Sequence, residues 1–211
     1  RWRASGHRHA GEGARWPRGH GGGALRLALV SEQLGGDPDG APRRGVIRHV
    51  AELARALAGA GHQVRVYTRI GQVDRGQQLA PGVPVEPLSV GPAGQLPDQE
   101  LRPVADAFAE RLAGRWRAGW RPEVVHAHHW LSGLAALEAG RVERVPVAVS
   151  YHELDPAGEG RRGAGDGGGR RELERQLGAA VDLVIGQTRA ELGELARLGV
   201  ARGRISLVPT G

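Results

Sequence analysis

Short apolar runs alternate with amphipathic segments from Leu25 to the end of the chain. Runs of this length, rich in valine and leucine, are typical of buried strands. They predict strands at 25–30, 63–68, 83–90, 123–128, 146–151, 182–187 and 204–209. Apolar residues at helical spacing predict helices at 46–60, 98–116, 131–139, 170–180 and 188–198. Strands that alternate with helices predict an α/β fold with a Rossmann-like, doubly wound, mostly parallel sheet.

Residues 1–23 differ from the rest because they show no hydrophobic periodicity and are rich in glycine, arginine and histidine. We interpret them as a disordered extension or as a leader that is not native to the protein. Residues 24–211 then form one Rossmann-like domain, because 211 residues favour a single sizeable core.

The composition narrows the function classes. The formal net charge of +6 comes from scattered arginines, whereas a nucleic-acid surface needs clustered basic residues with aromatic ones between them, so nucleic-acid binding is disfavoured. Without cysteine there is no disulfide, thiolate zinc site or cysteine nucleophile, which fits a reducing compartment and predicts a cytoplasmic protein. The apolar run at 24–30 is short and contains Arg26, so it cannot span a bilayer.

The loop at 31–45, "SEQLGGDPDGAPRRG", follows the first predicted strand and precedes a helix. In an open α/β sheet, ligands bind beyond the carboxyl ends of the strands. Glycines and a helix N-terminus there can offer N–H groups to an anion such as a diphosphate. The loop lacks the G-x-G-x-x-G pattern and the P-loop lysine, so NAD binding and ordinary ATPase chemistry are disfavoured. An ordinary surface loop is the alternative.

The stretch "VVHAHHWLSG" places three histidines at the end of the fourth predicted strand. His126 and His128 are two residues apart and point the same way, and His129 lies at the strand end. A zinc site needs three or four ligands, and nothing nearby supplies a well-spaced fourth, although His152 and Glu153 could approach from the next strand. Metal is therefore the least favoured interpretation. Packed histidines and histidines in a substrate cleft both stay open. Trp130 either packs in the core or stacks on a sugar face.

His152 follows the next predicted strand, in "SYHELD". A histidine whose ordinary pKa lies near neutrality can carry a proton or donate a hydrogen bond at a reacting centre. An exposed loop histidine without a function is the alternative.

Taken in order, four segments resemble the N-terminal half of retaining GT-B glycosyltransferases, in particular the group of D-inositol-3-phosphate glycosyltransferase and sucrose synthase. They are "GVIRHVAELARALAGAGHQVRVYTR", "PEVVHAHHWLSGLAAL", "VPVAVSYHEL" and the segment from "RRELERQL" to Gly211. The resemblance covers residues 25–211. It implies an acceptor-side Rossmann-like domain, whose C-terminal, nucleotide-sugar-binding partner domain is absent from this chain. Because the chain ends inside a "VP-x-G" element that such proteins continue, we expect no turnover from it alone.

The resemblance also assigns roles to residues. His152 matches the catalytic histidine of the family, and Gly45 matches the second glycine of a Gly-Gly loop that approaches the donor diphosphate. Arg44 replaces the first glycine, and it either pairs with phosphate or blocks the close approach.

The expected acceptor-binding residues are Trp130 and three positions that depart from the family. Asp98, His129 and Glu153 stand where relatives hold an acceptor phosphate with lysine, tyrosine and threonine. Two carboxylates would repel a phosphate, so we expect an acceptor without one.

The implied function is retaining transfer of a hexosyl group from a nucleotide sugar, typically a UDP-sugar, to an acceptor hydroxyl. The partners are this donor and a small-molecule, glycan or lipid acceptor, while contact with a membrane surface and the oligomeric state stay open. No cofactor or metal is expected, because basic side chains and helix dipoles can neutralise the leaving diphosphate. The rival hypothesis is a non-catalytic sugar- or nucleotide-binding module, or an inactive fragment.

Overall fold

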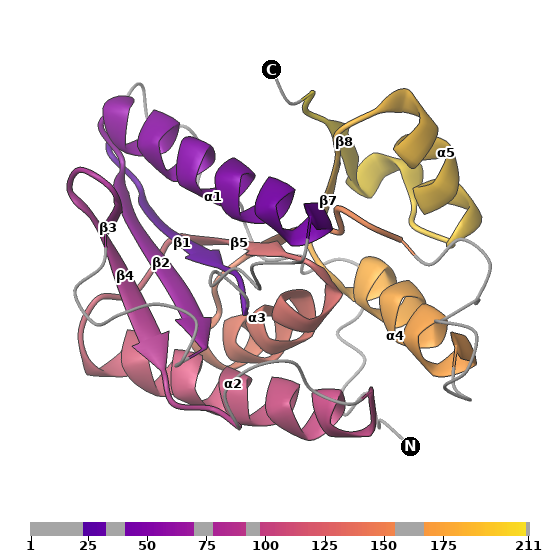
Figure 1. Ribbon diagram of the computed structural model, residues 1–211, viewed down its shortest axis with the longest axis horizontal. Coiled ribbons are helices and arrows are strands. Elements are labelled where there is room, and N and C mark those ends of the chain that lie inside the picture. Colours follow the sequence, from indigo (N-terminus) through magenta and orange to yellow (C-terminus); the bar gives the residue numbers. More distant parts are fainter. Residues whose placement is uncertain (1–22, 33–40, 70–77, 92–97, 155–166, 210–211) are drawn as a thin grey trace.

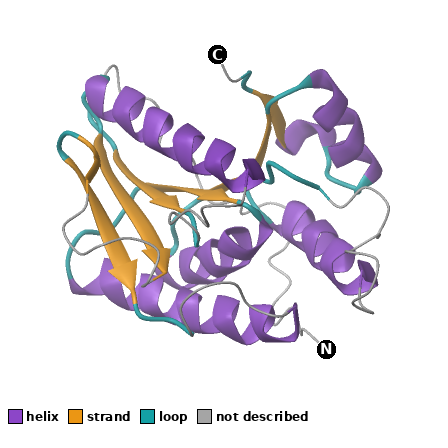
Figure 2. Ribbon diagram, viewed as in Figure 1, coloured by secondary structure: helices purple, strands orange, loops and turns teal. Residues whose placement is uncertain are grey.

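The computed structural model of the chain describes residues 23–32, 41–69, 78–91, 98–154 and 167–209. In the described residues a single twisted sheet lies between helices (Figures 1 and 2). The predicted leader falls almost entirely on residues 1–22, which are outside this description.

Eight strands form the sheet in the order β3-β4-β2-β1-β5-β6-β7-β8. The strands are β1 (Arg26–Val30), β2 (Gln63–Arg69), β3 (Gln78–Ala80), β4 (Val83–Leu88), β5 (Val124–His128), β6 (Val147–Ser150), β7 (Leu183–Gly186) and β8 (Ile205–Leu207). All neighbours pair in parallel except β3 and β4, which pair antiparallel. The order reverses direction at β1, which confirms the Rossmann-like, doubly wound, mostly parallel sheet.

Five α-helices connect the strands: α1 (Ala41–Gly59), α2 (Asp98–Ala118), α3 (Trp130–Glu143), α4 (Gly167–Ala180) and α5 (Arg189–Arg197). A short 3-10 helix, η1 (Arg202–Arg204), precedes β8. Figure 1 shows α1 over one face of the sheet and α2, α3 and α4 over the other. Because crossovers between parallel strands are right-handed, connections that run in opposite directions across the sheet lie on opposite faces. α1 connects β1 to β2, away from β8, so it lies on the opposite face from α3 and α4, which lead toward β8.

Two helix starts and one helix end differ from the predictions. The first helix begins at Ala41 rather than at residue 46, so Arg44 and Gly45 lie inside it and not in the preceding loop. Pro42 suits a first helical turn, since the N–H that proline lacks would have no partner there. The third helix runs on to Glu143 rather than ending at residue 139, and the fourth begins at Gly167 rather than at residue 170.

The sheet separates two hydrophobic cores. Leu29 of β1 faces α1 and packs with Val50 and Ala54 of that helix. The larger core, on the other face, includes Val125 and Ala127 of β5. Since side chains alternate along a strand, His126 and His128 of β5 point to the other face, toward α1.

Candidate functional site

His126 and His128 lie on the side of β5 that faces α1, near the carboxyl end of the strand. Their ring centroids are 4.2 Å apart, which confirms that the two side chains point the same way. His128 pairs in register with Ser150 of β6. The Oγ atom of Ser150 forms a hydrogen bond of 2.9 Å with Nε2 of His126.

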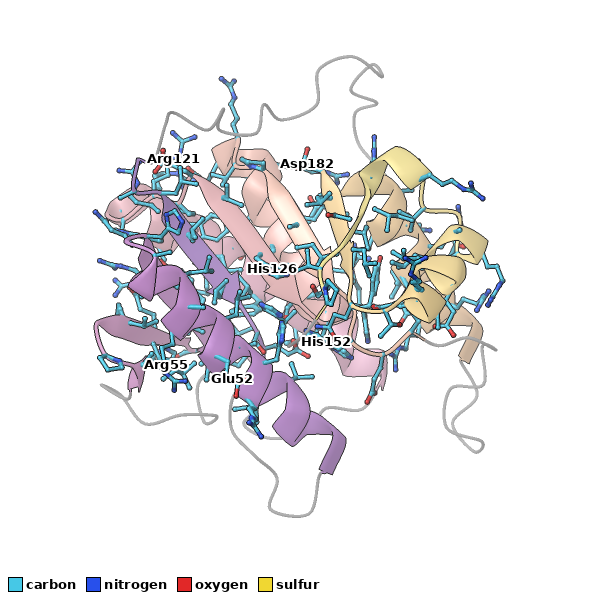
Figure 3. All side chains as sticks on the ribbon, turned by 90° about the horizontal axis from the view of Figure 1, so that it is seen from above. Glu52, Arg55, Arg121, His126, His152 and Asp182 are labelled. Atoms are coloured by element: carbon cyan, nitrogen blue, oxygen red, sulfur yellow. The ribbon has the colours of Figure 1, made fainter. Side chains whose placement is uncertain are left out.

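Two further histidines join them from other elements. His152 follows β6, and its Nε2 atom lies 3.0 Å from Nδ1 of His128. His49 comes from α1, with its ring centroid 5.6 Å from that of His128 and 5.2 Å from that of His152. His49, His126, His128 and His152, which we call the histidine cluster, thus connect α1, β5 and the segment after β6; Figure 3 shows His126 and His152 beside α1.

Burial keeps these imidazoles uncharged. It lowers the pKa of His126 to about 3 and that of His152 to about 4, and neighbouring histidines add to both shifts. Burial also holds the pKa of His128 well below its ordinary value, and it lowers the pKa of His49, against which Glu52 acts. A buried imidazolium would lose its hydration, so the neutral form is favoured around neutral pH. His152 can therefore donate one hydrogen bond and accept another there, but it does not supply a positive charge.

The protons of the cluster cannot satisfy every nitrogen. Gln187 places its amide Nε2 atom 3.3 Å from Nδ1 of His152. If this amide donates, His152 carries its proton on Nε2 and donates to His128, whose own proton then lies on Nε2. If the amide is turned so that its oxygen faces the ring, the donor between the two histidines is His128. In both arrangements Nε2 of His128 stays buried without a hydrogen-bond partner among the described residues.

A buried carboxylate lies next to the cluster. Glu32 follows β1 and is only 3% exposed. Its backbone N–H donates to Oγ of Ser132 over 2.9 Å, and the Ser132 hydroxyl donates back to the Glu32 carboxylate. His129 Nδ1 donates to the other carboxylate oxygen over 3.0 Å. Burial alone would raise the pKa of Glu32, but His129 and these hydrogen bonds outweigh it and hold the pKa below its ordinary value, so Glu32 is a fixed negative charge.

The backbone is unusual at two of these residues. His129 has φ 76° and ψ 153°, and His152 has φ 64°. A φ and ψ like those of His129 are almost confined to glycine, and such positions cost of order 1–3 kcal/mol each. Among the described residues, Arg144 is the other non-glycine residue with positive φ. It ends α3 in the left-handed conformation that is ordinary for a helix C-terminus.

Of the five other predicted site residues, the structure describes the surroundings of Trp130, Glu153 and Gly45. Trp130 is 4% exposed and packs in the larger core, which favours the packing interpretation over sugar stacking. Glu153 is exposed, and its backbone oxygen accepts a hydrogen bond of 3.0 Å from Arg170. Gly45 is exposed within α1, with open space around the position of a Cβ. The side chains of Arg44 and Asp98 lie outside the described part of the structure.

Sequence reasoning missed His49, Glu32 and Ser132. His49 lies four residues before Leu53, on the stripe of α1 that packs against the sheet. A polar residue on the apolar stripe of a helix is a signal that could have identified it. Glu32 and Ser132 carry no such signal, because they lie a hundred residues apart and meet only in the fold.

A surface cavity of about 710 Å³ between β4 and α2 is a less suitable site. Its charged lining residues include Glu86 and Arg115, which pair with each other over 2.7 Å, and Glu86 also pairs with Arg65 over 2.6 Å. Strands β2 and β1 separate it from the histidine cluster. The cavity therefore adds no group to the candidate site.

Comparisons with known proteins show the family of the chain. A family model described as "Glycosyl transferase 4-like domain" matches residues 44–211. D-inositol 3-phosphate glycosyltransferase of Acidothermus cellulolyticus is 36% identical over 172 residues, which are 77% of this chain and 38% of that protein. The homologous enzyme of Pseudarthrobacter chlorophenolicus is 30% identical over 200 residues, 88% of this chain and 47% of that protein. The chain thus spans between a third and a half of the curated relatives it matches.

Solved structures share the fold. Sucrose-phosphate synthase from Thermosynechococcus elongatus superposes with a TM-score of 0.71 at 24% identity, over 89% of this chain and 48% of that one. HepE from Anabaena, in complex with UDP and glucose, superposes with a TM-score of 0.57 at 12% identity, over 89% of this chain and 45% of that one. None of the helices in the described ranges combines the length and the apolar character needed to cross a bilayer.

Proposed function

The chain belongs to the glycosyl transferase 4-like domain family, and we propose that it is the acceptor-side half of a retaining glycosyltransferase with a GT-B fold. The complete protein would transfer a hexosyl group from a nucleotide sugar, a UDP-sugar, to an acceptor hydroxyl. The absence of cysteine from the sequence supports a cytoplasmic location for the reaction.

One observation carries the proposal: His152 lies at the carboxyl end of a parallel strand, in the crevice region where doubly wound sheets bind their ligands. Its ring is held by His128 and Gln187, and its backbone is held at positive φ. A ring that is already oriented loses little entropy when it contacts a substrate. With a pKa of about 4, His152 is neutral, so a ring nitrogen that exchanges its protein partner for the reacting sugar would serve as a hydrogen-bonding group rather than as a cationic acid.

The amino end of α1 supports a donor-diphosphate site. The first turn of a helix leaves N–H groups free, and its dipole favours an anion. Because α1 begins at Ala41, the free N–H groups belong to residues before Gly45, and Arg44 is close enough in sequence to add a positive charge. HepE, whose fold is similar, is known in complex with UDP and glucose. With these groups to offset the diphosphate charge, we propose that transfer needs no metal.

The acceptor class is proposed from the residues at the predicted acceptor positions. Relatives of this chain are named for inositol 3-phosphate, whereas this chain carries the acidic residues Asp98 and Glu153 at two of these positions. Fixed negative charges raise the free energy of a bound phosphate in a partly dry cleft. We therefore propose an uncharged hydroxyl acceptor, such as a sugar, a glycan or a lipid-linked sugar.

The test uses the protein encoded by the complete open reading frame that contains this chain. UDP release is measured with UDP-sugars against a panel of acceptors that includes inositol phosphate. His152→Ala should lower turnover at least about 100-fold. His62→Ala should not, because His62 directly precedes β2 and so lies at the amino ends of the parallel strands, whereas His152 lies at their carboxyl ends.

Each outcome separates the hypotheses. Unchanged turnover in His152→Ala would remove His152 from catalysis. Saturable binding of a UDP-sugar without UDP release to any acceptor would favour a binding module. Strong turnover with inositol phosphate would refute the proposed acceptor class.

A further inference from the structure

Three histidines of the cluster, His49, His128 and His152, bring one ring nitrogen each to within 4.8 Å of the others. They come from α1, from β5 and from the segment after β6, so the fold gathers them from three separate parts of the chain. Packing alone does not require the ring nitrogens of three histidines to converge in this way.

The spacing of two of the three nitrogens is close to that of metal ligands. Two imidazole nitrogens at 2.0–2.1 Å from a tetrahedral zinc ion lie roughly 3.3–3.4 Å apart. Nδ1 of His128 and Nε2 of His152 are 3.0 Å apart, so a shift of a few tenths of an ångström would admit an ion between them. The nitrogen of His49 lies within 4.8 Å of the other two, so its half-buried side chain has to move closer before all three can bind one ion.

The donor set indicates the type of metal. Three imidazoles without a thiolate suit zinc and neighbouring divalent transition metals, whereas magnesium and calcium prefer oxygen ligands. Three protein ligands leave a fourth position for water. The amide of Gln187, turned so that its oxygen faces Nδ1 of His152, would accept the proton on the far side of that ligand, as the outer partners of metal-bound histidines do.

We propose that His49, His128 and His152 form a binding site for one divalent transition-metal ion, with zinc as the representative metal. The sequence argument against metal considered His126, His128, His129 and His152 but lacked His49, which only the position of α1 adds. An ion at this site would occupy His152 and so compete with its role in transfer. That consequence rests on the proposed function, whereas metal binding does not.

The test measures zinc binding to the 211-residue chain directly. Because His7, His9 and His20 near the N-terminus can also bind zinc, the parent protein for all measurements carries asparagine at these three positions. Isothermal titration with Zn²⁺ should give one site in this parent, and Co²⁺ should give the visible absorption of a tetrahedral complex with nitrogen ligands.

The variants decide the assignment. His49→Ala should weaken zinc binding more than about tenfold and abolish the cobalt spectrum, while His62→Ala, outside the cluster, should bind as the parent does. His128→Ala should behave like His49→Ala; if it fails to fold by circular dichroism, His49→Ala alone decides, because His49 is only half-buried.

Two results would overturn the proposal. One is a parent that shows no saturable binding of Zn²⁺. The other is zinc affinity in His49→Ala equal to that of the parent. Neither depends on transferase activity, so failure of this proposal and failure of the proposed function are separable.

Discussion

Lowering the pH from about 7.5 to about 5.5 should destabilise the fold through its buried histidines. In the native protein burial lowers the pKa of His126 to about 3 and that of His152 to about 4, so both stay neutral over this range. In the unfolded chain a histidine takes up a proton with a pKa of about 6.5. The unfolded state therefore binds more protons, and the free energy of unfolding falls as the pH falls from about 6.5 toward 4.

The magnitude follows from the two pKa values. At pH 5.5 protonation favours the unfolded state by about 1.4 kcal/mol for each such histidine, and at pH 7.5 by about 0.1 kcal/mol. The change is about 1.3 kcal/mol for each, or about 2.6 kcal/mol for His126 and His152 together. His128, whose pKa burial also holds well below its ordinary value, adds a loss of the same sign. A loss of this size is a large share of the 5–15 kcal/mol that stabilises a typical domain.

The assay is urea unfolding followed by far-ultraviolet circular dichroism, at both pH values and at constant ionic strength. The free energy of unfolding should be lower at the acidic pH by at least about 2.6 kcal/mol. His152→Gln, which cannot take up a proton, should reduce this difference by about 1.3 kcal/mol. An equal free energy at both pH values, or an undiminished difference in His152→Gln, would refute the argument that burial keeps these rings neutral.

Further substitutions test the packing and the buried carboxylate by the same unfolding assay. Gly140→Ala should destabilise by about 1–3 kcal/mol, because its Cβ would lie 2.8 Å from a backbone oxygen, whereas Gly114→Ala, exposed in α2 with open space around it, should stabilise by about 0.5–1 kcal/mol. Equal effects would contradict the close approach of α3 to β6. Glu32→Gln should cost about 1–3 kcal/mol near neutral pH, since it weakens the hydrogen bonds that the buried carboxylate accepts; a neutral effect would mean that Glu32 is protonated. Tyr151→Phe should cost about 1 kcal/mol, because the phenol donates to a backbone oxygen over 2.7 Å, and an unchanged urea midpoint would rule out that bond.

Much of the fold was predictable because strands of a parallel sheet are buried on both faces and appear as continuous apolar runs. Seven strands lie within two residues of their predicted bounds. β3 was missed, since its three residues, "QLA", are too short to show a pattern and form only by pairing with β4. The start of α1 was placed late, because arginines and Gly45 conceal the helical period in its first turns.

The candidate site was predictable only where it depends on local geometry. That His126 and His128 share a face follows from the period of two along a strand, and the position of His152 follows from the end of β6. His49 joins them through the path of α1 across the sheet, which no local pattern fixes. The burial of Glu32 depends on Ser132 and His129, which are distant in sequence, so its charge and its partners appear only in the folded chain.

The strained backbone at His129 and His152 gives the strongest reason to regard this region as functional. Glycine would adopt both positive φ values without penalty, so packing and topology alone do not explain a histidine at either position. What each side chain gains is a fixed direction: His129 donates to Glu32, and His152 meets His128. Arg144 shows the contrast, since its positive φ ends a helix in the ordinary way. Unusual backbone that orients two imidazoles, at the carboxyl ends of neighbouring strands, is what a site that presents these rings to a ligand would use.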